Sequence, residues 1–120
     1  MQGFHSVLTS DDVEHYCNIK TAKTFLERTR GLLFSPKLST DQGLWIERCS
    51  SIHTFGMVYP LDVLFVDGNG VVIRVASNIK PFRFCMCLGA SSVLELAAGV
   101  AGKLGIRNGQ QLRLRRCSEK

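Results

Sequence analysis

The chain has 120 residues, of which 45% are hydrophobic and 21% are charged, and its formal net charge is +5. This length suits a single domain over residues 1–120 with a core of its own, and we expect frayed ends at 1–3 and 117–120. No apolar run reaches the roughly 18–20 residues of a membrane span, and the start lacks the basic flank and apolar stretch of a signal peptide. The sequence therefore predicts a cytoplasmic protein without a membrane span and leaves an exported mature form open.

The first part of the chain predicts short strands and one helix. Strands or extended arms are expected at 4–9 and 13–19. Apolar residues near helical spacing predict a helix over 21–33, with Thr21 as its cap and a Ser-Pro pair as its stop. After a turn, a further strand is expected at 44–48.

The middle of the chain carries the clearest local signal. An extended piece at 52–57 leads to a predicted strand at 61–66, and the run DGNG at 67–70 separates that strand from a β-branched run at 71–75. Asp-Gly and Asn-Gly between such runs are typical of tight hairpins. We therefore expect 61–66 and 71–75 to pair.

The last part predicts three more strands, at 82–88, 93–96 and 111–115, and a short helix over 97–104 that ends at Gly105. Many short strands with two small helices indicate an α+β fold dominated by strands. The expected architecture is an antiparallel β-sandwich or a squashed barrel with two short helices.

Four pieces of the sequence stand in a characteristic order: RTRGLLF, DQGLWI, IHTFGMVYPLDVLFVDGNGVVI and VLELAAGVAGKLGIRNGQQL. Together they resemble the family catalogued as domain of unknown function 192, over roughly residues 21–112. The resemblance implies a compact β-rich domain with no established reaction. Because His53 stands shortly before the motif methionine, the chain resembles the histidine-containing branch. The family's motif positions fall on Arg30, Gly31, Met57, Asp62 and Glu95.

Two carboxyl groups, Asp62 and Glu95, lie inside apolar strands. Burying a carboxylate costs several kcal/mol unless it is hydrogen-bonded or paired. One reading makes the two acids a functional pair with shifted pKa values. The other makes one of them a structural anchor whose partner is Arg30 or a run of backbone N–H groups. Both readings stay open.

A polar set inside apolar strands, with no complete catalytic motif, predicts a small binding module for a polar ligand. Its pocket is expected to be lined by His53, Phe55, Met57, Asp62, Glu95 and Arg30. The alternative is a hydrolase or isomerase that uses Asp62 or Glu95 as base and His53 as acid. The sequence therefore leaves open whether the protein is an enzyme.

The five cysteines form an odd set without C-x-x-C spacing, which favours a reducing compartment over a disulfide scaffold. Cys85 and Cys87 alternate along a predicted strand and could hold a metal ion together with His53 or Cys49. Structural zinc sites usually show a C-x₂₋₄-C pair, however. The sequence therefore predicts no metal and no cofactor.

Positive charge gathers in the second half of the chain, where residues 61–120 hold nine Lys or Arg and four Asp or Glu, the whole of the net charge. The alternation over 113–116 is typical of a solvated basic edge strand. A third possible function is an interaction domain that binds acidic partners through this strand. No aromatic side chains interleave the cluster as stacking platforms, which argues against nucleic acid. We expect a monomer.

Overall fold

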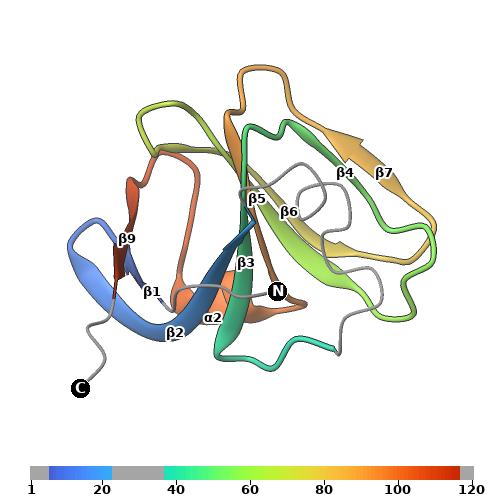
Figure 1. Ribbon diagram of the computed structural model, residues 1–120, viewed down its shortest axis with the longest axis horizontal. Coiled ribbons are helices and arrows are strands. Elements are labelled where there is room, and N and C mark those ends of the chain that lie inside the picture. The colour runs from blue at the N-terminus through green and yellow to red at the C-terminus, as the bar shows by residue number, and fades with distance from the viewer. Residues whose placement is uncertain (1–5, 23–36, 117–120) are drawn as a thin grey trace.

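The computed structural model describes residues 6–22 and 37–116 of the protein (Figure 1). Strands dominate this part of the chain, and one short helix accompanies them. The strands are β1 (Ser6–Ser10), β2 (Val13–Ala22), β3 (Gln42–Glu47), β4 (Ser51–His53), β5 (Leu61–Val66), β6 (Val72–Ile79), β7 (Phe84–Met86), β8 (Ser92–Ala97) and β9 (Leu112–Arg116), and the helix is α2 (Val100–Leu104).

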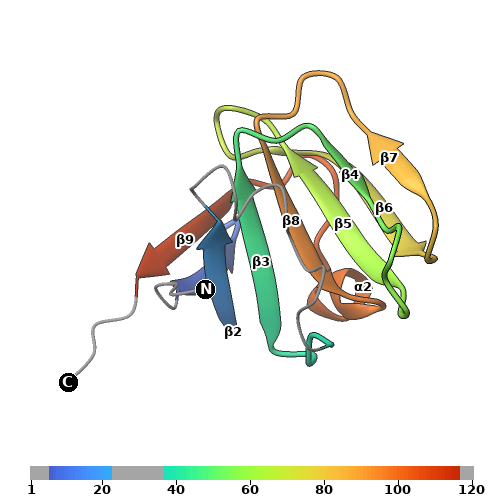
Figure 2. The same ribbon diagram turned by 45° about the vertical axis from the view of Figure 1, so that its right-hand side comes forward.

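Seven of the strands form one sheet in the order β6-β5-β8-β3-β2-β1-β9. Neighbours in this sheet run antiparallel except for β2 and β3, which run parallel. The other two strands, β4 and β7, form a separate antiparallel pair at the rim of the molecule (Figure 2). The predicted β-dominated α+β class, with a sandwich-like or barrel-like sheet, is confirmed.

The two ends of the large sheet meet and give it a barrel-like form. An isolated antiparallel bridge joins Val71, just before β6, to Gln111, just before β9. Beside it, the Leu112 N–H donates to the Gly70 carbonyl at 2.7 Å. Gly70 has φ +85, and a Cβ there would lie 2.9 Å from the Leu112 carbonyl oxygen, so only glycine fits this approach. We call this junction of 70–72 with 109–112 the seam.

The buried apolar side chains form two clusters, one on each face of β5 and β8. Successive strand residues point to opposite faces, and all six residues of β5 are buried. One cluster, the helix-side core, packs Leu64 and Leu94 against Val100 and Ala101 of α2. The other, the hairpin-side core, joins further β5 and β8 side chains to the β4–β7 pair and its loops: Leu61, Val63, Phe65, Val93, Ile52, Met57, Tyr59 and Cys85, among others.

The predicted helix over 21–33 is wrong at its start. Thr21 and Ala22 continue β2, where they pair in parallel with Trp45 and Ile46 of β3, and Ala22 is fully buried. Tertiary pairing therefore overrides the local helical spacing. The remainder of the predicted helix, and Arg30 within it, lie outside the described residues.

Two further boundaries differ from the predictions. The helix expected over 97–104 begins only at Val100, because Ala97 ends β8 and Gly99 adopts a left-handed conformation. The strand expected over 82–88 shrinks to β7 (84–86), because Phe82 has φ +63, which lies outside the extended region of a regular strand. Within the described ranges, no helix is long and apolar enough to cross a membrane.

Candidate functional site

Asp62 is the second residue of β5, and its carboxylate is almost completely buried. Oδ1 accepts a hydrogen bond from the Asn78 N–H at 2.8 Å. Oδ2 accepts two more, at 3.0 Å each, from the N–H groups of Gly99 and Ala101 at the start of α2. The first N–H groups of a helix have no partner within the helix, so a buried carboxylate is a suitable acceptor for them. One side chain thus ties β5 to the end of β6 and to α2.

This geometry supports the anchor reading of Asp62, with backbone N–H groups as the partners. These donors belong to residues 78, 99 and 101, which are distant along the chain, because both edges of β5 are already paired with β6 and β8. Both carboxylate oxygens are engaged in holding the fold together.

Glu95 has a different environment in the neighbouring strand β8, where it stands between Leu44 of β3 and Val63 of β5. Its side chain is 4% exposed, and burial raises the pKa of its carboxyl from 4.5 to about 7. Among the described residues, no group forms a hydrogen bond with its Oε1 atom. By strand alternation Glu95 shares the face of Val93, which belongs to the hairpin-side core.

Tyr59 is the polar neighbour of Glu95. Its side chain packs in the hairpin-side core and is 8% exposed, and its hydroxyl likewise has no hydrogen-bond partner in the described part of the chain. Burial raises the pKa of Tyr59, and the charge of Glu95 raises it further. Because Glu95 affects the titration of Tyr59, the two groups lie within electrostatic reach of each other. We call Glu95 and Tyr59 the buried polar pair.

His53 and Phe55 lie on the outside of the molecule. His53 ends β4 and is exposed, and its Nδ1 accepts a 3.3 Å hydrogen bond from the Phe55 N–H. The two rings stack with centroids 5.3 Å apart. Ile52, the residue before His53, is buried in the hairpin-side core. Met57, only two residues beyond Phe55, is buried in the hairpin-side core.

The structure therefore packs Met57 and Tyr59 in the hairpin-side core, which covers the face of β8 that carries Glu95. It places His53 and Phe55 on the outer face and engages Asp62 with backbone groups. Sequence reasoning missed Tyr59. The available signal was a tyrosine placed directly before a proline within an apolar run.

Cys85 belongs to β7 and its side chain is buried in the hairpin-side core, and Cys85 and Cys87 are free thiols. Across residues 6–22 and 37–116, no group of three or more His, Cys, Asp or Glu side chains is arranged to hold a metal ion. Of the residues proposed for such a site, Cys49, Cys85 and Cys87 all pack in or against the hairpin-side core, whereas His53 is exposed on the other side of β4.

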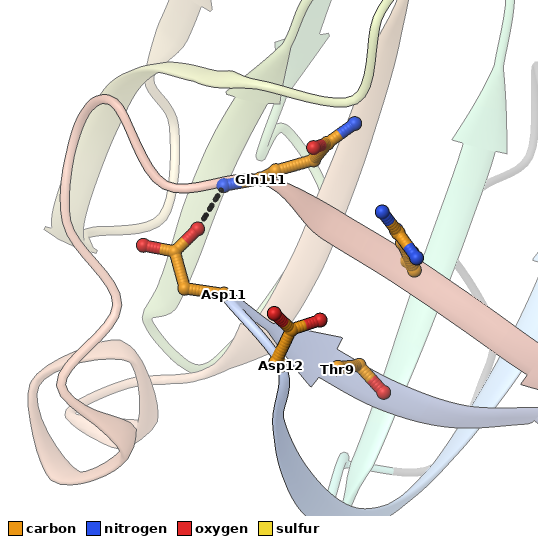
Figure 3. Close-up of a pocket in the computed structure, with 5 residues that line it drawn as sticks. Thr9, Asp11, Asp12 and Gln111 are labelled. Atoms are coloured by element: carbon orange, nitrogen blue, oxygen red, sulfur yellow. Dashed lines mark hydrogen bonds between the residues drawn. The ribbon is translucent and has the colours of Figure 1, made fainter.

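A shallow polar cleft of about 180 Å³ opens beside the seam, at the turn between β1 and β2 (Figure 3). Asp11 and Asp12 form this turn with φ +47 and +68, the left-handed values of a two-residue hairpin. Asp11 Oδ1 accepts a 2.8 Å hydrogen bond from the Gln111 N–H, so this carboxylate fastens the turn to the seam. The other lining residues are Thr9 and Arg113.

The basic strand at the end of the chain is β9, the last strand in the order of the large sheet. Arg113 and Arg115 are exposed on it, and Arg115 forms a 2.8 Å ion pair with Glu14 of β2. Exposed pairs of this kind contribute about 0–1 kcal/mol to stability. The strand is therefore a solvated basic element of the large sheet.

The chain is similar to proteins whose function is not established. The model of the DUF192 family, described as Uncharacterized ACR, matches residues 6–114. A UPF0127 protein of Thermococcus sibiricus is 29% identical over 99 residues, a match that covers 78% of this chain and 64% of that protein. The chain thus spans slightly less than two thirds of the length of this relative.

Two solved structures share the fold. A protein of unknown function from Novosphingobium aromaticivorans is 27% identical, with a TM-score of 0.80 over 91% of this chain and 83% of that one. A candidate transcription regulator from Sinorhizobium meliloti is 22% identical, with a TM-score of 0.81 over 95% of this chain and 97% of that one. At this identity the second likeness concerns the fold alone.

Proposed function

The chain belongs to the DUF192 family, and from this premise we propose that it is a small binding module that holds a polar ligand at the buried polar pair. One observation carries the proposal. Glu95 Oε1 and the Tyr59 hydroxyl are both buried, and neither has a hydrogen-bond partner in the described part of the chain. A buried polar group without a partner costs about 1–3 kcal/mol. A ligand that forms hydrogen bonds with both groups removes that cost.

The chemistry of the pair indicates the class of ligand. A carboxyl with a pKa of about 7 exists in both forms near neutral pH, so it can donate or accept a hydrogen bond, and a phenol can do the same. The surrounding side chains of the hairpin-side core are apolar. This combination suits a small molecule with an apolar body and one polar end that carries an amine, amide or hydroxyl group.

The remaining predicted contacts take different roles in this proposal. Met57 is a wall of the site, because it packs in the same core as Tyr59. Asp62 supports the site by fixing α2 against β5. In this proposal His53 and Phe55 border the ligand site from the outside, and Arg30 is a further ligand contact. We further propose a monomer in the cytoplasm, which the free thiols of Cys85 and Cys87 suit.

A reaction at the same site is the second candidate. A carboxyl whose pKa lies near neutrality is suited to proton transfer at physiological pH. In this hydrolase or isomerase alternative, Glu95 is the acid or base. Asp62 is a poor candidate for that role, because backbone N–H groups already occupy both oxygens of its carboxylate.

The test is a fragment screen by ligand-observed NMR, with a panel of small aliphatic and aromatic amines, amides and alcohols. We expect binders whose affinity falls about tenfold or more in Glu95→Gln and in Tyr59→Phe, since each loses one hydrogen bond to the ligand. Glu47→Gln, on β3, is the matched control and should bind as the wild type does. The absence of binders, or equal binding by all variants, would contradict the proposal.

Activity screening on the same variants separates binding from catalysis. In the enzyme alternative, Glu95→Gln abolishes turnover of an ester, amide or isomerisable substrate while it retains part of the binding. In the binding-module proposal, no substrate is turned over by the wild type.

A further inference from the structure

The β4–β7 pair presents an apolar face to the outside. In its register Ile52 stands opposite Cys85, and both point into the hairpin-side core. Alternate residues point the other way. His53, which stands opposite Phe84, therefore lies on the outward face together with Met86. Figures 1 and 2 show this pair at the rim of the molecule, away from β9.

Two phenylalanines from the adjoining loops extend this surface, which we call the aromatic face: His53, Phe55, Phe82, Phe84 and Met86. Phe82 is 66% exposed, Phe84 60% and Phe55 50%. The rings of Phe55 and Phe82 lie 6.5 Å apart, and His53 stacks on Phe55. Contiguous exposed apolar surface on a small domain marks an interaction site.

The loop that carries Phe82 is held in place by Thr54, whose side chain is fully buried. The Thr54 hydroxyl donates to the Lys80 carbonyl at 2.7 Å and accepts from the Arg83 N–H at 2.8 Å. The Thr54 carbonyl accepts from the Phe82 N–H at 3.1 Å. These bonds hold Phe82 at φ +63, a strained value for a bulky residue. Strain of this kind clusters at functional sites, and the fixed loop presents the ring to solvent.

The charge around the aromatic face is of one sign. Residues 48–61 and 72–92, which contain both strands and their loops, hold four Lys or Arg and no Asp or Glu. Lys80 and Arg83 flank Phe82 and are exposed. Arg74 reaches the face as well, since its Nη1 donates to the Met86 carbonyl at 2.7 Å. The complementary partner is therefore apolar at its centre and anionic at its surface.

We propose that the aromatic face, together with Lys80 and Arg83, docks the protein onto the surface of a membrane that contains anionic lipids. Phenylalanines enter the boundary between headgroups and acyl chains, and the cations contact lipid phosphates and carboxylates. Two aliphatic loop residues that closely follow Phe55 and Met86 along the chain, Val58 and Leu88, are 89% and 85% exposed and would add apolar contacts.

The same observations disfavour two other partners. Val58, Leu88 and Met86 offer no platform for stacked bases, and the exposed rings of His53 and Phe55 already stack on each other. A peptide strand would have little to pair with, because β4 and β7 are three residues each, about 10 Å long.

The test is flotation of the protein with vesicles of phosphatidylcholine alone and of phosphatidylcholine with about 30% phosphatidylserine, at low and physiological salt. We expect binding to the anionic vesicles that weakens as salt rises. Lys80→Ala and Arg83→Ala should each weaken it about fivefold, and Phe82→Asn about tenfold. Asparagine suits this position because it tolerates positive φ.

Val13→Ser and Lys103→Ala are the matched controls, since Val13 is 59% exposed and Lys103 is an exposed cation, and neither belongs to the aromatic face. Both should bind as the wild type does. A second readout is Phe84→Trp, whose emission should shift to the blue on anionic vesicles only.

Three results would overturn the proposal. The first is an absence of flotation with anionic vesicles when the thermal unfolding midpoint shows a folded protein. The second is equal binding by the control and aromatic-face variants. The third is that the wild type does not bind vesicles but uses the aromatic face for another partner. This would appear as binding to polyglutamate or to a single-stranded oligonucleotide, or as self-association in sedimentation, that is lost in Phe82→Asn.

Discussion

Asp62 and Glu95 lie in adjacent strands and are both almost completely buried, but their carboxyl groups differ in hydrogen bonding. Asp62 accepts hydrogen bonds from three backbone N–H groups, which engage both of its oxygens. Glu95 Oε1 has no hydrogen-bond partner in the described ranges, and burial alone raises its pKa to about 7. The first carboxyl therefore serves the fold, and the second is the one to which we assign the proposed ligand.

The raised pKa of Glu95 predicts a stability that depends on pH. Because the pKa of Glu95 in the folded state, about 7, lies above its ordinary value of 4.5, the contribution of Glu95 to stability is fully present below pH 4.5 and is lost as the pH rises through 7. Glu95→Gln removes this titration. We expect the variant to gain about 2–3 kcal/mol relative to the wild type between pH 4.5 and 7.5.

Urea denaturation of both proteins at each pH measures the difference, in which the titration of all other groups cancels. A difference that stays constant over this range would show that the carboxyl of Glu95 titrates normally.

The anchor role of Asp62 predicts a loss of stability on truncation. Asp62→Ala should destabilise the fold by about 2–4 kcal/mol, because three buried N–H groups lose their acceptor. Asp62→Asn should cost less, since one oxygen remains as an acceptor. Denaturant midpoints decide this, with Asp12→Asn in the exposed β1–β2 turn as the control. Unchanged midpoints in both Asp62 variants would discard the anchor.

The sequence could identify Asp62 as a residue that needs partners, because a carboxylate inside an apolar strand is costly. It could not identify those partners, because residues 78, 99 and 101 are distant along the chain and meet only once β5 lies between β6 and β8. Tyr59 was missed for a related reason. Its closeness to Glu95 depends on the packing of the hairpin-side core, which no local pattern records.

At the scale of elements, local signals succeeded where the backbone itself sets the structure. The run at 67–70 forms the predicted turn, and Asp67 Oδ1 accepts from the N–H groups of Asn69 and Val71. Local signals failed where distant strands decide. β2 continues to Ala22 because β3 pairs with it in parallel. The strand predicted from residue 82 begins only at Phe84, because residues 82 and 83 bond to Thr54 instead.

The bonds of Thr54 predict that its hydroxyl stabilises the loop at 80–83. Thr54→Val preserves shape and removes two hydrogen bonds, so it should destabilise the protein by about 1–3 kcal/mol. Hydrogen exchange at the Phe82 and Arg83 amides should accelerate more than exchange in β5. Thr54→Ser keeps the hydroxyl and should restore slow exchange at both amides. Equal exchange in the valine variant and the wild type would mean that the loop holds its shape without Thr54.

At the scale of the whole molecule, the seam distinguishes a closed sheet from an open one. The class of fold and most of the strands follow from the alternation of residues and the turn signals. The strand order does not follow from these signals. β1 pairs with β9 and β5 pairs with β8, and the local sequence of one strand does not indicate a partner so distant along the chain.

Two glycines with similar backbone angles test the seam. Gly70 and Gly109 have φ +85 and +92, but a Cβ at Gly109 would meet open space, whereas at Gly70 it would lie 2.9 Å from the Leu112 carbonyl oxygen. Gly109→Ala should therefore cost only the backbone strain of about 1–2 kcal/mol. Gly70→Ala should cost about 1 kcal/mol more, as the hydrogen bond to Leu112 is disturbed. Thermal or urea unfolding compares the two variants. Equal losses of unfolding free energy would show that the seam accommodates a Cβ at residue 70 without cost.

The pairing of β1 with β9 has a consequence for how the protein is made. Ser6–Ser10 is translated about a hundred residues before its partner Leu112–Arg116. Until then one edge of β1 has no partner, and exposed strand edges favour aggregation. Contacts between such distant segments also slow folding. We therefore expect the large sheet to complete only after translation of β9, so that nascent chains arrested before residue 112 remain sensitive to protease and are protected once that strand has emerged.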